Sequence, residues 1–144
     1  MTERPRYPVG VNFFVVRDKK LLLGRRLQGY CAGTWGLPGG HMELGERMIA
    51  TARRELMEET GMTAERFEFA NLVNDRKQAA DGKVHYLQIG FLAINPTGEP
   101  ILKEPDMCAE WKWFDLQHLP VDIFPPHIEQ VQLFAKGGQF IDNG

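Results

Sequence analysis

Residues 40–62 read GHMELGERMIATARRELMEETGM, and this stretch carries the pattern that decides the fold. Its glycines, with those just before it, allow a sharply bent loop that can approach a ligand, because glycine tolerates positive φ and has no side chain. Good helix formers follow from Glu46, and Gly61 suits the C-terminal end of a helix. An apolar stripe at helical spacing is expected to be buried: Ile49, Ala52 and Leu56. The pattern predicts a glycine-rich loop and then a helix over about residues 46–60.

Three carboxylates share one face of this predicted helix. Glu55, Glu58 and Glu59 stand at i, i+3 and i+4, so their side chains come within one turn of each other. One interpretation is a solvated charged face on which Arg54 pairs with Glu58. The other is a site for a hard divalent cation, which would replace mutual repulsion by coordination through the oxygen ligands that Mg²⁺ prefers.

The spacing of the whole stretch resembles the Nudix box at every fixed position. Gly40 is followed after five residues by Glu46, and after seven more by RELMEETGM over residues 54–62. The resemblance implies an α/β domain in which a mixed, mostly antiparallel sheet is sandwiched between helices. It also implies a pyrophosphohydrolase that uses Mg²⁺ or Mn²⁺ to cleave a nucleoside diphosphate linked to another group.

The resemblance further implies roles for individual residues of the box. Arg54 looks like the residue that orients a glutamate. Glu46 looks like a support for the loop or for the water shell of the metal, and near a helix N-terminus it would also favour the helix dipole without any catalytic role. The metal ligands implied are the carbonyl of Gly39 and the carboxylates of Glu55, Glu58 and Glu59.

A later segment adds a candidate catalytic carboxylate. Alternation over residues 110–114 predicts a strand, and a glutamate followed by aromatic residues and a Leu-Pro turn resembles the late Nudix segment. By that resemblance Glu110 is either a metal ligand or the general base, and Glu55 is the other candidate for the base. The catalytic residues implied are Arg54, Glu55, Glu59 and Glu110.

Four residues are candidates for substrate contacts. Arg25 leaves a predicted strand toward a glycine-containing loop, where it either meets phosphate or is a solvated strand end. Phe124 opens an FPP entry to a predicted closing helix, which resembles the last helix of MutT-type enzymes, where the nucleobase pocket is lined. Ile128 stands where those enzymes have a guanine-reading asparagine, and His41 stands where a lysine is usual. We therefore expect no large preference for 8-oxo-guanine nucleotides.

Further strands are predicted from β-branched, aromatic and alternating runs. Residues 9–16 and the run from Leu21 predict a hairpin, and Trp35 and Leu37 are expected to pack under the box helix. Residues 84–94 predict a strand that is joined to an earlier one by an Asp-Gly turn at residues 81–82. That earlier strand has one face at period two: Phe67, Phe69, Asn71 and Val73.

Length and composition limit the number of domains, the kind of partner and the cellular location that are expected. A chain of 144 residues suits one domain over residues 1–144. A net charge of −2 with mixed signs provides no basic surface for a nucleic acid polymer, so a small nucleotide substrate is expected. Cys31 and Cys108 match no disulfide or zinc pattern and predict reduced thiols in a cytoplasmic protein. No apolar run approaches the roughly 20 residues of a membrane span.

The function expected from the sequence is cleavage of a nucleoside triphosphate, possibly a modified one, to a nucleoside monophosphate and pyrophosphate. The group that the chain resembles includes dimers, so a homodimer is also expected. One alternative is a hydrolase of nucleotide sugars, ADP-ribose or other nucleoside diphosphate derivatives, which would use the same box with a different pocket. Another is a binding module without activity, but such modules generally lose box carboxylates, and here none is missing.

Overall fold

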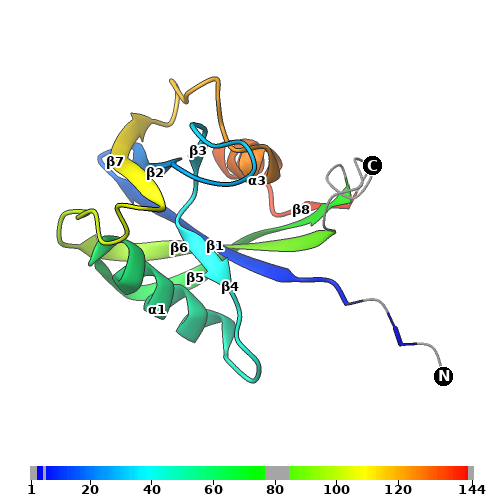
Figure 1. The fold of residues 1–144 in the computed structure, drawn as a ribbon. Helices are drawn as coiled ribbons and strands as arrows, with labels where there is room; N and C mark the ends of the chain where they lie inside the picture. Colours follow the sequence, from blue (N-terminus) through cyan, green and yellow to red (C-terminus); the bar gives the residue numbers. More distant parts are fainter. Residues whose placement is uncertain (1–2, 5, 77–84, 143–144) are drawn as a thin grey trace.

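The computed structural model describes residues 3–4, 6–76 and 85–142. In these described residues, four strands precede helix α1, three strands separate it from helix α3, and one strand follows (Figure 1). Its elements are β1 (Val9–Arg17), β2 (Lys20–Arg26), β3 (Trp35–Gly36), β4 (Gly39–His41), α1 (Met48–Thr60), β5 (Thr63–Asp75), β6 (Tyr86–Thr97), β7 (Cys108–Asp115), α3 (Pro125–Ala135) and β8 (Phe140–Ile141).

The strands of the described residues form one eight-stranded sheet in the order β3-β2-β1-β6-β5-β8, with β4 paired to β1 and β7 to β2. β1 runs parallel to β6, and β5 to β8, whereas the other pairs are antiparallel. α1 lies on one side of the sheet and α3 on the other (Figure 1). The predicted α/β fold, with a mostly antiparallel sheet between helices, is confirmed.

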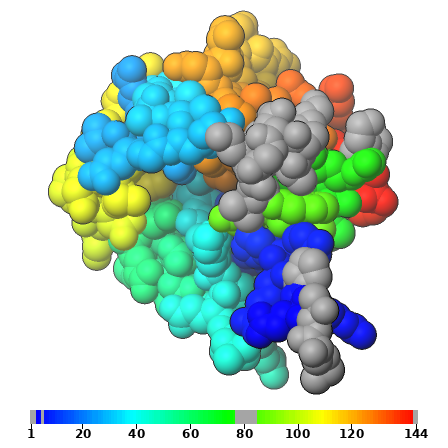
Figure 2. Space-filling model, turned by 45° about the vertical axis from the view of Figure 1, so that its right-hand side comes forward, coloured from blue at the N-terminus to red at the C-terminus, as the bar shows by residue number. Residues whose placement is uncertain are grey.

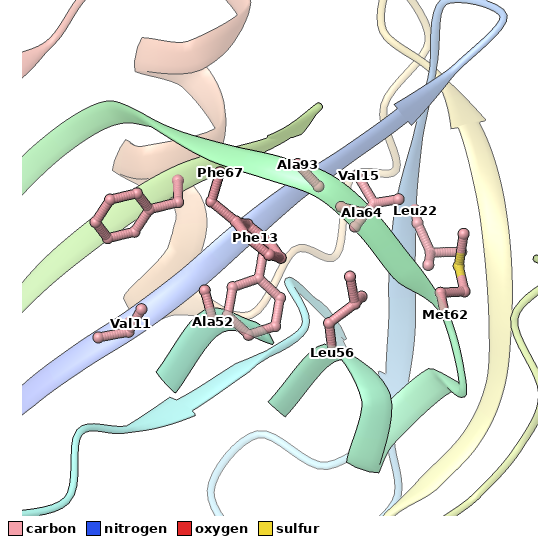
Figure 3. Packing of buried hydrophobic residues seen from close by; sticks show 11 residues of the cluster. Val11, Phe13, Val15, Leu22, Ala52, Leu56, Met62, Ala64, Phe67 and Ala93 are labelled. Atoms are coloured by element: carbon pink, nitrogen blue, oxygen red, sulfur yellow. The ribbon is translucent and has the colours of Figure 1, made fainter. Parts of the chain in front are cut away.

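Alternation along β1 sends side chains to two separate cores. Phe13 joins the cluster beneath α1, where it lies beside Ala52 and Leu56 (Figure 3). Phe14 joins the cluster beneath α3 with Val131, and its ring stacks on that of Phe134 at 4.1 Å between centroids. Because successive side chains of a strand point to opposite faces, one central strand anchors both helices.

The box helix begins later than predicted. α1 starts at Met48, because the chain turns at residues 43–46 and Arg47 is extended, with φ −76° and ψ 145°. Its C-terminal end matches the prediction, since Gly61 adopts a φ of 73° and donates its N–H to the carbonyl of Met57. The predicted buried stripe is correct for Ala52 and Leu56 but wrong for Ile49, which is 45% exposed at the start of the helix.

Two predictions about the face of the sheet on which side chains lie are wrong. Trp35 and Leu37 pack in the cluster beneath α3 instead of under the box helix. In β5 the pairing with β6 shifts between Phe69 and Asn71, so the two residues do not share a face. Phe69 contacts Phe91, whereas Asn71 bonds to α3. A bulge inserts one residue, and this moves the following side chains to the opposite face.

The predicted hairpin is confirmed, since β1 and β2 pair on either side of a turn at Asp18 and Lys19, both of which have positive φ. β5 and β6 are antiparallel neighbours as predicted. The Asp-Gly turn expected at residues 81–82 lies outside the described residues. Within the part of the chain that the structure describes, no helix is long and apolar enough to cross a membrane.

Candidate active site

Arg54 connects the acidic residues of the box. Its Nε and Nη2 donate to the two oxygens of Glu46 at 2.9 and 3.1 Å. Its Nη1 donates to Glu55 Oε1 at 2.9 Å and to Glu58 Oε2 at 3.2 Å. The simple Arg54–Glu58 pair of a solvated helix face is therefore formed, but it is one part of a larger arrangement. A planar guanidinium with several donors at fixed angles can orient three carboxylates at once.

Glu46 lies in the loop before α1 and folds back toward the helix. Besides Arg54, its Oε1 accepts from Thr51 Oγ1 at 2.6 Å and from the backbone N–H of Glu43 at 3.0 Å. The hydrogen bonds from Arg54, then those from Thr51 and the Glu43 backbone, lower the pKa of Glu46 to about 2. Its two carboxylate oxygens accept hydrogen bonds from the loop, from Thr51 and from Arg54, an arrangement that suits a residue supporting the loop.

Glu59 and Glu55 point from α1 toward the glycine loop. Glu59 Oε2 accepts the backbone N–H of Gly39 at 3.0 Å, and a side chain at Gly40 would come within 2.5 Å of the Glu55 carboxylate. Burial raises the pKa of Glu59 to about 9 and also raises the pKa of Glu55. Two partly desolvated carboxylates on one helix face favour a nearby positive charge, because each is costly to ionise alone.

The donor set fits a hard divalent cation. Among the described residues, no three Asp, Glu, His or Cys side chains converge as a closed metal-binding group, and Glu58 is turned toward Arg54. Mg²⁺ does not require such a group, because it keeps several waters and binds through one or two carboxylates. Glu55, Glu59 and the glycine loop offer oxygen ligands of this kind. The side-chain-free backbone at Gly40 leaves room for the Glu55 carboxylate.

Glu104, which was not among the site residues predicted from the sequence, comes close to this group. It lies between β6 and β7 and lines a cavity together with Glu59, and its charge helps to raise the pKa of both Glu55 and Glu59. Glu110, the predicted late carboxylate, is exposed on β7 and lines neither of the cavities described below. In the sequence, the signal for Glu104 was a carboxylate in the proline-containing loop just before the strand that forms β7.

Two adjoining cavities open beside these carboxylates, and Figure 2 shows the surface hollowed between the light-blue segment after β2 and the cyan-to-green region of β4 and α1. The larger has a volume of about 290 Å³ and the smaller about 140 Å³. Arg26, Leu37 and Glu59 line both. The larger is also lined by Gly10, Asn12, Gly39, Gly40, His41, Tyr86, Gln88, Phe124, Pro126 and His127.

The predicted substrate residues are distributed unevenly around these cavities. His41 and Phe124 line the larger one, and His41 Nε2 lies 2.9 Å from the hydroxyl of Tyr86. Arg25 lines only the smaller one, whereas Arg26 lines both and places its guanidinium 3.8 Å over the Phe124 ring. Ile128 lines neither cavity.

His127 occupies the cavity wall on the helix where Ile128 was expected to contribute. Its Nδ1 accepts the backbone N–H of Leu37 at 3.0 Å, and its side chain is 8% exposed. Burial, with a smaller contribution from the charge of Arg26, lowers the pKa of His127 to about 3. The imidazole is therefore neutral, with its proton on Nε2, because Nδ1 must be unprotonated to accept.

The sequence that forms this box, sheet and cavity matches a known family over most of its length. The model of the NUDIX domain matches residues 6–134. The chain belongs to the Nudix hydrolase family. A Nudix relative from Danio rerio, the oxidized purine nucleoside triphosphate hydrolase, is 34% identical over 107 residues, covering 74% of this chain and 65% of the relative. The ADP-ribose pyrophosphatase of Methanocaldococcus jannaschii is 32% identical over 112 residues, covering 78% of this chain and 64% of the relative.

Solved structures agree with this assignment. The MutT NUDIX hydrolase from Burkholderia pseudomallei superposes with a TM-score of 0.80 and 32% identity, covering 92% of this Nudix chain and 98% of that one. The chain thus spans nearly all of a solved MutT-type protein, but slightly less than two thirds of the two curated relatives.

Proposed function

We propose that this Nudix chain is a metal-dependent pyrophosphohydrolase that cleaves nucleoside triphosphates, including modified ones, to a nucleoside monophosphate and pyrophosphate. One observation carries the proposal: the larger cavity begins at Glu59 and the glycine loop and extends to Phe124 and His127. A phosphate chain at the first end would leave the base near the second. The similarity to a named oxidized purine nucleoside triphosphate hydrolase supports this choice of substrate class.

In the proposed reaction, Glu55, Glu58, Glu59 and the Gly39 carbonyl would hold Mg²⁺ or Mn²⁺. When bound, the ion would neutralise phosphate oxygens and acidify the attacking water. Arg54 fixes the direction of the Glu55 carboxylate through the 2.9 Å hydrogen bond. The Gly39 N–H does the same for Glu59. Such positioning lowers the barrier because the groups are ordered before the substrate reacts.

Three carboxylates are candidates for the base that takes the proton from water. Glu55 and Glu110 were the candidates from the sequence. We add Glu104, because it shares a cavity with Glu59 and acts electrostatically on Glu55. Glu110 is exposed, as Glu104 is, but it lines neither of the two cavities. A base must come within hydrogen-bond reach of the water, directly or through one further water. The placement of Glu104 beside the box favours it over Glu110.

The alternative substrate class is a nucleoside diphosphate derivative such as ADP-ribose or a nucleotide sugar. It is favoured by the similarity to a named ADP-ribose pyrophosphatase and by the smaller cavity, which could receive a second group beyond Glu59. A panel of triphosphates, nucleotide sugars, ADP-ribose and diadenosine polyphosphates, with products separated by chromatography, decides between the classes. If one of the diphosphate derivatives has a kcat/KM more than about tenfold above that of every triphosphate, the alternative replaces the first proposal.

We also propose that residues 1–144 form one domain and that two copies associate. Light scattering of the purified protein at several concentrations tests the second point, and a constant monomer mass would contradict it. A cytoplasmic location remains a prediction based on the two cysteines, both of which are free thiols in the structure.

A further inference from the structure

A chain of buried amide side chains leads from the core beneath α3 to the wall of the larger cavity. It begins at Asn71, whose Nδ2 donates to the backbone carbonyl of Gln130 at 3.1 Å. A carbonyl only accepts, so this contact determines which end of the Asn71 amide is nitrogen. Asn71 Oδ1 then accepts from Gln130 Nε2 at 3.4 Å, which determines the orientation of the Gln130 amide.

The Gln130 amide in turn determines the orientation of the Asn12 amide, and Asn12 determines that of the Gln88 amide. Gln130 Oε1 accepts from Asn12 Nδ2 at 2.7 Å, and the same Nδ2 donates to Gln88 Oε1 at 2.8 Å. Both hydrogens of Asn12 Nδ2 are thereby used. Because the Gln88 side-chain oxygen faces Asn12, Gln88 Nε2 points away from Asn12. Within the described residues Gln88 Nε2 has no hydrogen-bond partner, although the side chain is 4% exposed and lines the larger cavity.

A second donor and a cation line the same cavity. His127 accepts through Nδ1, so its Nε2 carries a hydrogen, and Nε2 likewise has no partner among the described residues. Arg26 contributes a guanidinium above Phe124. The amide oxygen of Asn12, Oδ1, lies against Gly39, where it would collide with any added side chain.

We propose that Gln88 and His127 select the nucleobase by donating hydrogen bonds to its oxo groups, so that guanine-, hypoxanthine-, uracil- and thymine-type bases are preferred over adenine and cytosine. The inference rests on the proposed function, since it assigns this end of the cavity to the base. Guanine presents O6 and N7 as adjacent acceptors and thymine presents O4, whereas adenine and cytosine present amino donors at the corresponding positions. An amino group there would face another N–H and leave the buried Gln88 donor unpaired.

The proposed donors are not the residue that the sequence indicated for this part of the pocket. The sequence indicated Ile128, but in the structure Gln88 and His127 line the cavity and Ile128 does not. A site that hydrogen-bonds a particular group rejects analogues that lack it far more strongly than an apolar pocket does.

Two matched pairs of substrates test the inference. Inosine and adenosine triphosphates differ in the group at position 6, and uridine and cytidine triphosphates in the group at position 4. We expect the oxo member of each pair to have a kcat/KM at least about tenfold higher, which is the effect of roughly one buried hydrogen bond. Values within about threefold for both pairs would overturn the inference.

Variants of Gln88 identify the residue responsible. Gln88→Met keeps the length and removes the donor, so the preference should fall to about threefold or less. Gln88→Glu keeps an oxygen toward Asn12 and replaces the donor by an acceptor, so the preference should move toward the amino bases. Gln132→Glu makes the same chemical change on the exposed side of α3 and should leave the preference as in wild type. An unaltered preference in both folded Gln88 variants would contradict the assignment.

Affinity for monophosphates separates failure of this inference from failure of the proposed function. If no triphosphate is hydrolysed, the proposed function fails. The inference is then judged by titration calorimetry with inosine and adenosine monophosphates and with uridine and cytidine monophosphates. Tighter binding of the oxo member, lost in Gln88→Met, supports it. Equal affinities within both pairs overturn it.

Discussion

The buried neutral His127 makes a specific prediction about stability at mildly acidic pH. Its pKa is about 3 in the folded protein because of burial, compared with 6.5 for an unperturbed histidine. Between these values the unfolded chain binds a proton at this position and the folded chain does not, so the free energy of unfolding rises with pH. The part of the free energy of unfolding that depends on a neutral His127 is therefore fully present above pH 6.5 and is lost as the pH falls toward 3.

The magnitude follows from the two pKa values. The slope of the free energy of unfolding against pH approaches about 1.4 kcal/mol per pH unit. Lowering the pH from 7 to 5 should therefore remove about 2 kcal/mol of the free energy of unfolding. His127→Gln provides the reference, because glutamine can still accept the Leu37 N–H through its side-chain oxygen but does not titrate. Glu59, whose pKa is raised by burial, titrates in both proteins, so its contribution cancels in the difference.

The assay is urea denaturation of both proteins at pH 7 and pH 5, followed by the difference between their free energies of unfolding. The advantage of the wild type over His127→Gln should shrink by about 2 kcal/mol between the two pH values. A change below about 0.5 kcal/mol would show that the imidazole protonates normally in the folded protein, and that its burial does not keep it neutral at pH 5.

Four further predictions follow from the site and the core. Hydrolysis should require Mg²⁺ or Mn²⁺ and stop with a chelator, and Glu59→Gln should fold normally but lose most turnover; activity within about threefold of wild type would exclude its proposed role. Arg54→Lys should lower kcat far more than it raises KM, because an ammonium cannot reproduce the contacts to three carboxylates; the opposite pattern would indicate that Arg54 binds substrate. Glu104→Gln should lower kcat by at least about tenfold more than Glu110→Gln does, and equal effects would remove the case for Glu104. Leu56→Ala, at a fully buried position, should lower the free energy of unfolding by about 2–5 kcal/mol in urea denaturation.

The local sequence was sufficient to predict the box helix and its face of carboxylates. Helical spacing alone places Glu55, Glu58 and Glu59 on one side, and Gly61 ends the helix because it readily adopts positive φ. The antiparallel pairing of β1 with β2 was also predictable, because a short turn at Asp18 and Lys19 joins them. These features depend on residues only a few positions apart, and the resemblance to the Nudix box added their chemistry.

Only the tertiary structure decided which distant residues complete the site. The pairing of β2 with β7 shifts between Gly24 and Arg26, so simple alternation along the strand does not reveal which arginine reaches the larger cavity. Gln88 acquires its orientation from hydrogen bonds that span up to 118 residues of sequence. Register shifts and long-range hydrogen bonds depend on how strands and helices pack, and a local pattern contains no information about that packing.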